Sequence, residues 1–273
     1  MEWLTGLNNQ INNLNIVTVV IENATGKCPP NASRLLFMKN IIQENIYSDI
    51  ILFPAGYFNF DFSIRKETKI NGLCDKISSF LFDIGCNSVV CVGIDCSNGR
   101  HQFAVAVNKD GIQALARKFY PTDAEHGYVR NALSFNCLEM GYPRVLNIKN
   151  SRVYLAVCYD VFGIKHHEQP NDGVDIVLTL AHQFWKRGEG PSGDVDFARK
   201  GFAGASQHWK CPVFGTAVFY CREIPQNWPT GILWVDSTKN VRQFTYDDNQ
   251  LSWSKRNKII GKTEIAICYT YSL

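Results

Sequence analysis

The sequence has little net charge and no long apolar segment, and both absences limit what the protein can bind or cross. It has 28 Lys and Arg residues against 25 Asp and Glu residues, for a formal net charge of +3. So small an excess does not provide the basic face by which proteins bind nucleic acid or an anionic membrane. No window approaches 18 uninterrupted apolar residues, the length that predicts a membrane span. We therefore expect neither nucleic acid nor a membrane as a partner.

Cysteine is abundant, but the patterns that normally explain many cysteines are missing. None of the ten cysteines forms a C-x-x-C pair, and the evenly spaced Cys86, Cys91 and Cys96 are five residues apart. These spacings do not match a zinc site. The first residues are acidic and then Asn-rich, unlike the basic and apolar regions of a secretory signal. We expect a cytoplasmic protein with reduced thiols, most of them buried as small hydrophobic side chains.

The remaining sequence is typical of one globular α/β domain. Hydrophobic residues make up 45% of it, and no linker, repeat or charge block interrupts it. We expect a single domain over residues 1–273, with 1–14 as an N-terminal extension. Apolar periodicity predicts helices at 33–46, 70–84 and 194–209. Strands are predicted at 16–21, 50–53, 88–94, 101–107, 112–119, 144–148, 153–157, 174–179, 213–220, 231–235 and 264–271. Buried strands flanked by helices, with an antiparallel hairpin turning at 108–111, predict a four-layer α-β-β-α sandwich.

Three strand ends carry residues that could take part in chemistry. They are Phe53-Pro54-Ala55-Gly56-Tyr57, Arg117-Lys118-Phe119-Tyr120-Pro121 and Val157-Cys158-Tyr159-Asp160. Loops after buried strands are where α/β folds hold their reactive groups. Each of these segments alone also has an ordinary explanation as a strand stop, a solvated rim or a buried thiol.

Taken together and in this order, the three segments resemble the nitrilase superfamily of carbon-nitrogen hydrolases, over residues 15–273. The resemblance implies that Cys158 is a nucleophile and that Lys118, with the backbone N–H of Tyr159, stabilises an oxyanion. It implies a small amide, carbamoyl compound or nitrile as substrate, and neither a cofactor nor a metal. It also implies a homodimer or a larger homo-oligomer.

One residue departs from the family pattern. The family has its general-base glutamate directly after the proline, and this chain has Ala55 there. Three explanations stand side by side: hydrolysis has been lost and binding kept, another carboxylate acts, or the alanine is an engineered change. Glu125, seven residues after Lys118, is the leading substitute. Its alternative role is to position Lys118 or to cap the next segment.

Residues near the other strand ends are candidates for the pocket wall. We predict substrate contacts from the side chains of Tyr57, Tyr159, His182, Phe184 and Trp185, although aromatic residues in such places could equally be core. Lys186 and Arg187 lie in the segment 182–194, and basic groups there would suit an acidic substrate.

The histidines allow two further hypotheses. His166, His167 and Glu168 are metal-ligand types, but adjacent histidines on an extended loop point apart, so we expect no metal site. A Cys–His dyad between Cys158 and His166, His182 or His208 is conceivable in principle. Nothing in the local sequence supports it.

Overall fold

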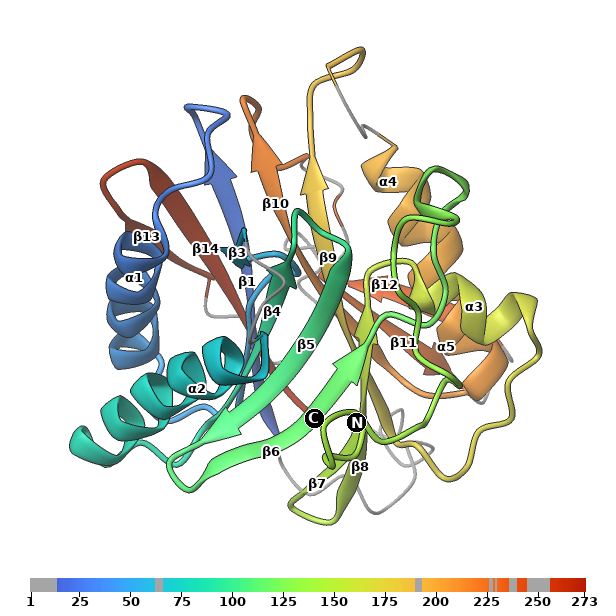
Figure 1. Cartoon of the computed structure of the whole chain (residues 1–273). Coiled ribbons are helices and arrows are strands. Elements are labelled where there is room, and N and C mark those ends of the chain that lie inside the picture. Colours follow the sequence, from blue (N-terminus) through green and yellow to red (C-terminus); the bar gives the residue numbers. More distant parts are fainter. Residues whose placement is uncertain are drawn as a thin grey trace.

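Two layers of strands lie between two layers of helices (Figure 1). The computed structural model describes residues 14–61, 66–189, 193–225, 228, 230–235, 240–244 and 256–273. The strands are β1 (Asn15–Asn23), β2 (Ile50–Leu52), β3 (Phe58–Phe60), β4 (Val89–Cys96), β5 (His101–Asn108), β6 (Gly111–Arg117), β7 (Val145–Ile148), β8 (Ser151–Val157), β9 (Ile176–Phe184), β10 (Val213–Tyr220), β11 (Gly231–Val235), β12 (Asn240–Phe244), β13 (Arg256–Ile260) and β14 (Glu264–Ser272). The helices are α1 (Asn31–Glu44), α2 (Lys66–Asp83), α3 (Asp160–His166), α4 (Asp194–Phe197) and α5 (Ala203–Trp209).

Strand β1 is shared by the two halves of the sheet. Along one edge, its residues 16–18 pair in parallel with β2 and its residues 21–23 pair in parallel with β10. Its other edge pairs with β14 in antiparallel register. The path then runs through β4, β5 and β6 on one side and through β9, β8 and β7 on the other. Strands β5 and β6 also contact β8 without pairing with it, so the two halves face each other.

The side chains of β1 alternate between two apolar cores. Ile16 and Val20 belong to the core that includes β8 and β9, while Val17, Val19 and Ile21 pack with α1 and α2. Both faces of such a strand are covered, which explains its continuous apolar run. Helices α1 and α2 cover one outer face, and α3 and α5 cover the other (Figure 1). The predicted α/β four-layer sandwich is confirmed.

Local structure differs from the sequence prediction in a few places. The prediction treats residues 166–168 as an extended loop, but His166 is the last residue of α3. This helix has only seven residues, too few for a clear apolar period. The helix expected at 194–209 is interrupted by a π-helical turn, Ala198–Phe202, between α4 and α5. Strands β3, β12 and β13 were not expected.

The two ends of the described chain lie together. Residues 1–13 of the expected N-terminal extension are outside the described residues, whereas Leu14 is fully buried and its carbonyl accepts a hydrogen bond from Leu273 N. Among the described residues, no helix combines the length and the apolar character needed to cross a bilayer.

Candidate active site

Cys158 lies at the junction between β8 and α3, on a strained backbone. Its φ is +52°, in the left-handed region that residues other than glycine rarely adopt. Its N–H donates to Leu180 O at 2.7 Å, which ties the junction to neighbouring strand β9. A strained strand-to-helix turn of this kind presents a nucleophile at the end of a sheet. The Cys158 side chain lines a cavity there.

Lys118 follows β6 and is fully buried against a single carboxylate. Its Nζ donates to Glu125 at 2.7 Å for Oε1 and 2.6 Å for Oε2. Glu125 also accepts hydrogen bonds from Thr122 N at 2.8 Å and from Gln102 Nε2 at 2.9 Å. Burial acts to raise the pKa of Glu125, but Lys118 and these hydrogen bonds outweigh it and lower the pKa to about 2. Glu125 is therefore a weak proton acceptor, and its contacts are those of a residue that positions Lys118.

Asp160 joins the segment after Lys118 to the strand end before Cys158. Its Oδ1 accepts from the N–H groups of Phe119 and Tyr120, both at 2.9 Å. Its Oδ2 accepts from Val157 N and from Arg144 Nη1, both at 3.0 Å. Asp160 and Arg144 are buried, so this ion pair is shielded from water. The Asp160 carboxylate thereby ties the backbone that follows Lys118 to the backbone that precedes Cys158.

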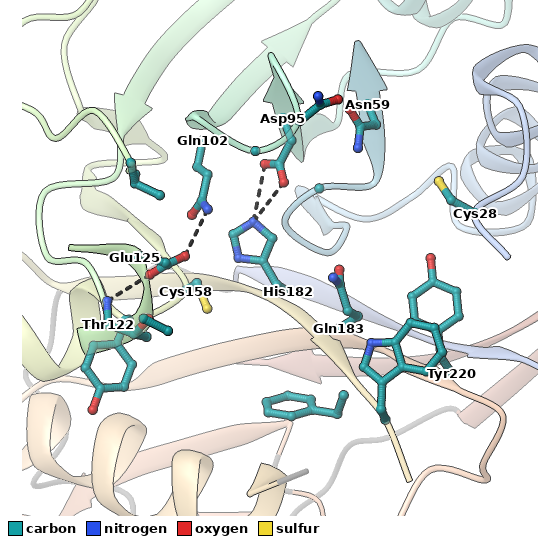
Figure 2. A pocket seen from close by; sticks show the side chains of 18 of the residues that line it. Cys28, Asn59, Asp95, Gln102, Thr122, Glu125, Cys158, His182, Gln183 and Tyr220 are labelled. Atoms are coloured by element: carbon teal, nitrogen blue, oxygen red, sulfur yellow. Dashed lines mark hydrogen bonds and ion pairs between the residues drawn. The ribbon is translucent and has the colours of Figure 1, made fainter. Parts of the chain in front are cut away.

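His182 on β9 and Asp95 on β4 form a second polar pair in the same cavity (Figure 2). Nε2 of His182 lies 3.3 Å from Asp95 Oδ1 and 3.2 Å from Oδ2. The backbone next to His182 is tied to Ala55, because Ala55 N donates to the carbonyl of the preceding residue, Ala181, at 3.0 Å. A Cβ atom added to Gly56, whose φ is +58°, would lie 3.0 Å from Asp95 Oδ2 and 3.1 Å from His182 Cδ2.

The charges of these groups favour an ionised thiol. Burial acts to raise the pKa of Cys158, but Lys118 and then His182 outweigh it, so the pKa is lowered. Burial acts in the opposite direction on His182, whose pKa Asp95 and Cys158 together raise to about 10. Lys118 and His182 thus both favour the ionised form of the Cys158 thiol.

The cavity has a volume of about 650 Å³ and includes most of the predicted wall. Tyr159, His182, Phe184 and Trp185 line it. No Lys or Arg side chain is among its lining within the described part of the chain. Lys186 and Arg187 are exposed and lie outside that lining, which corrects the expectation that they face an acidic substrate.

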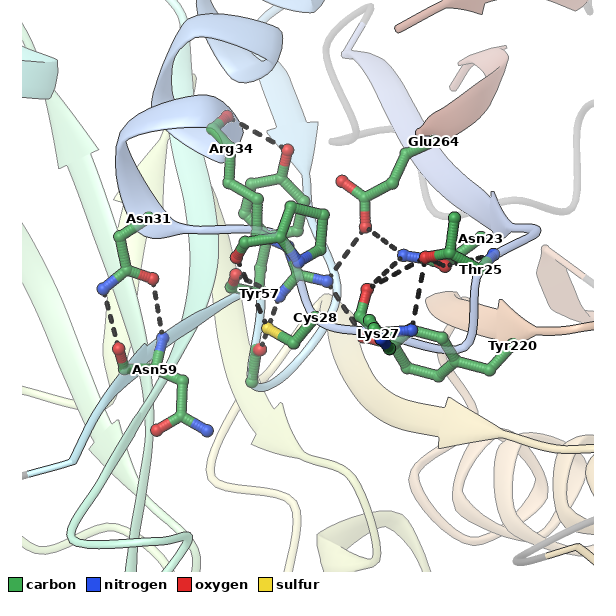
Figure 3. A network of polar contacts seen from close by, with 12 residues as sticks. Asn23, Thr25, Lys27, Cys28, Asn31, Arg34, Tyr57, Asn59, Tyr220 and Glu264 are labelled. Carbon is green, nitrogen blue, oxygen red and sulfur yellow. Dashed lines mark hydrogen bonds and ion pairs between the residues drawn. The ribbon is translucent and has the colours of Figure 1, made fainter. Parts of the chain in front are cut away.

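Tyr57 does not line the cavity, contrary to the sequence prediction. Its side chain is fully buried, and its hydroxyl donates to Arg34 O at 3.2 Å. The Arg34 guanidinium donates to the carbonyls of Gly56 and Tyr57, to Tyr220 Oη at 3.0 Å and to Glu264 Oε1 at 2.9 Å (Figure 3). Tyr57 thus belongs to a buried network that holds the turn after Ala55 in place.

The other histidines named from the sequence lie elsewhere. His166 Nδ1 is 3.2 Å from Tyr120 Oη, and His208 Nε2 is 3.0 Å from Gln169 O. Neither lines the cavity. In the part of the chain that the structure describes, no three His, Cys, Asp or Glu side chains are grouped as metal ligands. Sequence reasoning missed Asp95 and Arg144. It named His182 as a wall residue and as one of three histidines that could in principle pair with Cys158.

Solved structures with a similar fold belong to the nitrilase superfamily. A CN-hydrolase superfamily protein from Xanthomonas campestris, with an arsenic adduct in its active site, is 12% identical with a TM-score of 0.56, over 96% of this chain and 91% of its own. A mutant amidase from Nesterenkonia sp., whose active-site cysteine has undergone Michael addition of acrylamide, is 11% identical with a TM-score of 0.54, over 75% of this chain and 78% of its own. At these identities the likeness establishes the fold.

A larger protein contains a similar fold as one part. The glutamine-dependent NAD+ synthetase from Cytophaga hutchinsonii is 14% identical with a TM-score of 0.54, over 76% of this chain, and the match spans only 36% of the synthetase. No family model and no curated protein matches the sequence.

Proposed function

We propose that this protein is a cysteine-dependent hydrolase of non-peptide C–N bonds that works through a thioester acyl-enzyme. The observation that carries the proposal is the convergence of Cys158, on its strained turn, with the buried Lys118–Glu125 pair beside a cavity of about 650 Å³. The nitrilase-superfamily fold, shared with an amidase, supports the same chemistry. The predicted homo-oligomer and cytoplasmic location stay predictions.

The residues suit nucleophilic attack on an amide or nitrile carbon. The thiolate of Cys158 forms the S–C bond, and negative charge develops on the substrate oxygen or nitrogen. The buried ammonium group of Lys118 is in place to stabilise that charge. Because Glu125 binds Lys118 through both carboxylate oxygens, the ammonium group stays in place while negative charge develops on the substrate.

The cavity favours a small, uncharged substrate. Among its lining residues, Asp95 and Glu125 are acidic and none is Lys or Arg. Both carboxylates are already paired with a cation, Asp95 with His182 and Glu125 with buried Lys118, so an anionic substrate would find no free cation among the described lining residues and would lose its hydration without compensation. A volume of about 650 Å³ suits a small molecule rather than a peptide chain. We therefore propose a neutral amide, carbamoyl compound or nitrile.

Ala55 favours one alternative, a binding protein that has kept the pocket and lost turnover. Alanine cannot exchange a proton, and loss of a general base costs roughly 10²- to 10⁴-fold in rate. Such a protein would bind small amides without forming a covalent intermediate.

Intact-mass measurement distinguishes the two functions. Incubation with acrylamide and with a panel of small amides should give a single adduct on Cys158, because this thiol is the one with a lowered pKa in the cavity. Cys158→Ala should abolish the adduct. Cys28→Ala is the matched control, since Cys28 is an exposed thiol lining the same cavity. Tight amide binding with no adduct at Cys158 from any compound would support the binding protein instead.

A further inference from the structure

The site lacks the family's glutamate at position 55, yet the proposed reaction needs a group that both donates and accepts a proton. We infer that His182, oriented by Asp95, is the general acid and base of this site and replaces the carboxylate missing at Ala55. The inference rests on the proposed function, because it gives the cysteine-dependent reaction its proton carrier. It assigns to an imidazole a role that the sequence resemblance gives to a carboxylate.

Both carboxylates that line the cavity are already engaged. Glu125 is held by Lys118, Thr122 N and Gln102. Asp95 faces Nε2 of His182 and contacts no other cation among the described residues. This leaves Nδ1 of His182 as the ring nitrogen available to Cys158 or to a substrate.

The strand geometry brings this nitrogen to the thiol. Strands β8 and β9 are parallel neighbours, with Val157 opposite Leu180, and His182 lies two residues beyond Leu180 on β9. In Figure 2, Asp95 meets one side of the imidazole and Cys158 lies toward the other. The opposite pKa shifts that His182 and Cys158 cause in each other agree with this proximity.

Gly56 makes room for the pair. Its missing side chain lets Asp95 and His182 approach the turn beside Ala55, because a Cβ at this position would be about 3 Å from both side chains. The carboxylate absent from residue 55 is therefore matched by a carboxylate from β4 that acts through a histidine on β9. Asp95 is a positioning residue in this arrangement, and His182 touches the reacting atoms.

The proton steps balance for an amide substrate. The thiolate adds to the carbonyl carbon, and the C=O electron pair moves to oxygen beside Lys118. The C–N bond then breaks while the imidazolium gives its Nδ1 proton to the departing nitrogen, which leaves as the amine. Neutral His182 next takes a proton from water as the water oxygen attacks the thioester. Loss of the carboxylic acid restores the thiolate and the imidazolium.

Electrostatics agree with this exchange. The charged or titratable groups facing His182 are Asp95 from β4 and Cys158 from the end of β8, and Lys118 and Glu125 face the thiol from the β6 side. Forming the thioester removes the thiolate charge, which is one of the two anions that raise the pKa of His182. That pKa therefore falls in the acyl-enzyme, and the imidazole can accept a proton from water at the stage that requires it.

The test separates acylation from deacylation with p-nitrophenyl acetate, whose leaving group departs without protonation. The unchanged protein should release a burst of nitrophenol and then turn over. His182→Gln should keep the amplitude of the burst, although the burst is slower because the thiol loses a neighbouring cation. The later phase should slow roughly 10²-fold, with acetyl-Cys158 accumulating in the intact mass. Asp95→Asn should move the rising limb of the deacylation pH profile to lower pH, because it removes an anion that raises the pKa of His182. A residue with only a structural role would not shift this limb.

Each failure has its own meaning. Deacylation at the unchanged rate in His182→Gln, or an unmoved pH limb in Asp95→Asn, overturns the inference and leaves the cysteine hydrolase intact. Absence of any Cys158-dependent burst in the unchanged protein overturns the proposed function instead. Cys158 alkylation by iodoacetamide and thermal unfolding establish that both variants are folded. If His182→Gln does not fold, the Asp95→Asn pH profile decides the question alone.

Discussion

Replacing Lys118 with methionine should lower turnover of p-nitrophenyl acetate by about 10³-fold or more, the largest kinetic effect expected at this site. Removing one donor to an oxyanion costs roughly 10²- to 10³-fold, and this residue acts twice, because its charge also lowers the pKa of the Cys158 thiol. The midpoint of Cys158 alkylation by iodoacetamide should therefore move to higher pH. Rates of ester turnover and of alkylation across pH measure the two effects.

The matched control is Lys109→Met, on the exposed hairpin turn between β5 and β6. The Lys109 side chain is 39% exposed and its Nζ lies 3.5 Å from Asp110 Oδ1, a surface pair that contributes little. Turnover and the alkylation midpoint should both stay at their original values. An alkylation midpoint unmoved by Lys118→Met would show that His182 alone sustains the thiolate.

Lys118→Met should also change how the free energy of unfolding responds to acid. The folded-state pKa of Glu125 is about 2, below its ordinary 4.5, so its contribution to stability is present above 4.5 and is lost as the pH falls toward 2. Without Lys118 the main cause of this lowering disappears. The difference in unfolding free energy between the unchanged protein and Lys118→Met should thus be largest near neutral pH. It should shrink as the pH falls from 4.5 toward 2, and urea unfolding at several pH values measures it.

Much of the fold was predictable because its strands are buried on both faces. A continuous apolar run such as 16–21 predicts a buried strand regardless of which strands it pairs with, and this run predicted β1 correctly. Short elements carry too little pattern, and helix α3 shows this. Its seven residues include buried Val161 and Ile164 but span only two turns.

Local sequence could identify Cys158, Lys118 and Glu125 as candidates, but it could not pair His182 with Asp95. These two residues are 87 positions apart, and their contact depends on where β4 and β9 lie across the site. Spacing along the chain contains no such information. The prediction that Tyr57 lines the pocket was wrong for a related reason. An aromatic residue after a strand can face either a cavity or the core, and Tyr57 packs in the core beside Arg34.

Asp160→Ala should cause the largest loss of stability, about 3–5 kcal/mol in the free energy of unfolding. Arg144 would stay buried without its carboxylate, and the N–H groups of Phe119, Tyr120 and Val157 would lose their acceptor. Urea denaturation measures the loss, and Asp75→Ala on the exposed face of α2 is the control, expected within about 0.5 kcal/mol of the unchanged protein.

Activity should fall in Asp160→Ala even where the chain remains folded. Asp160 links the backbone after Lys118 to the backbone before Cys158, so its loss lets the cation and the thiol move apart. A displacement of about 1 Å in a catalytic pair can cost roughly 10²-fold. Measuring ester turnover well below the unfolding temperature separates this effect from stability. Unchanged turnover in a destabilised protein would mean that strand pairing of β8 with β9, rather than the Asp160 carboxylate, sets the distance between Lys118 and Cys158.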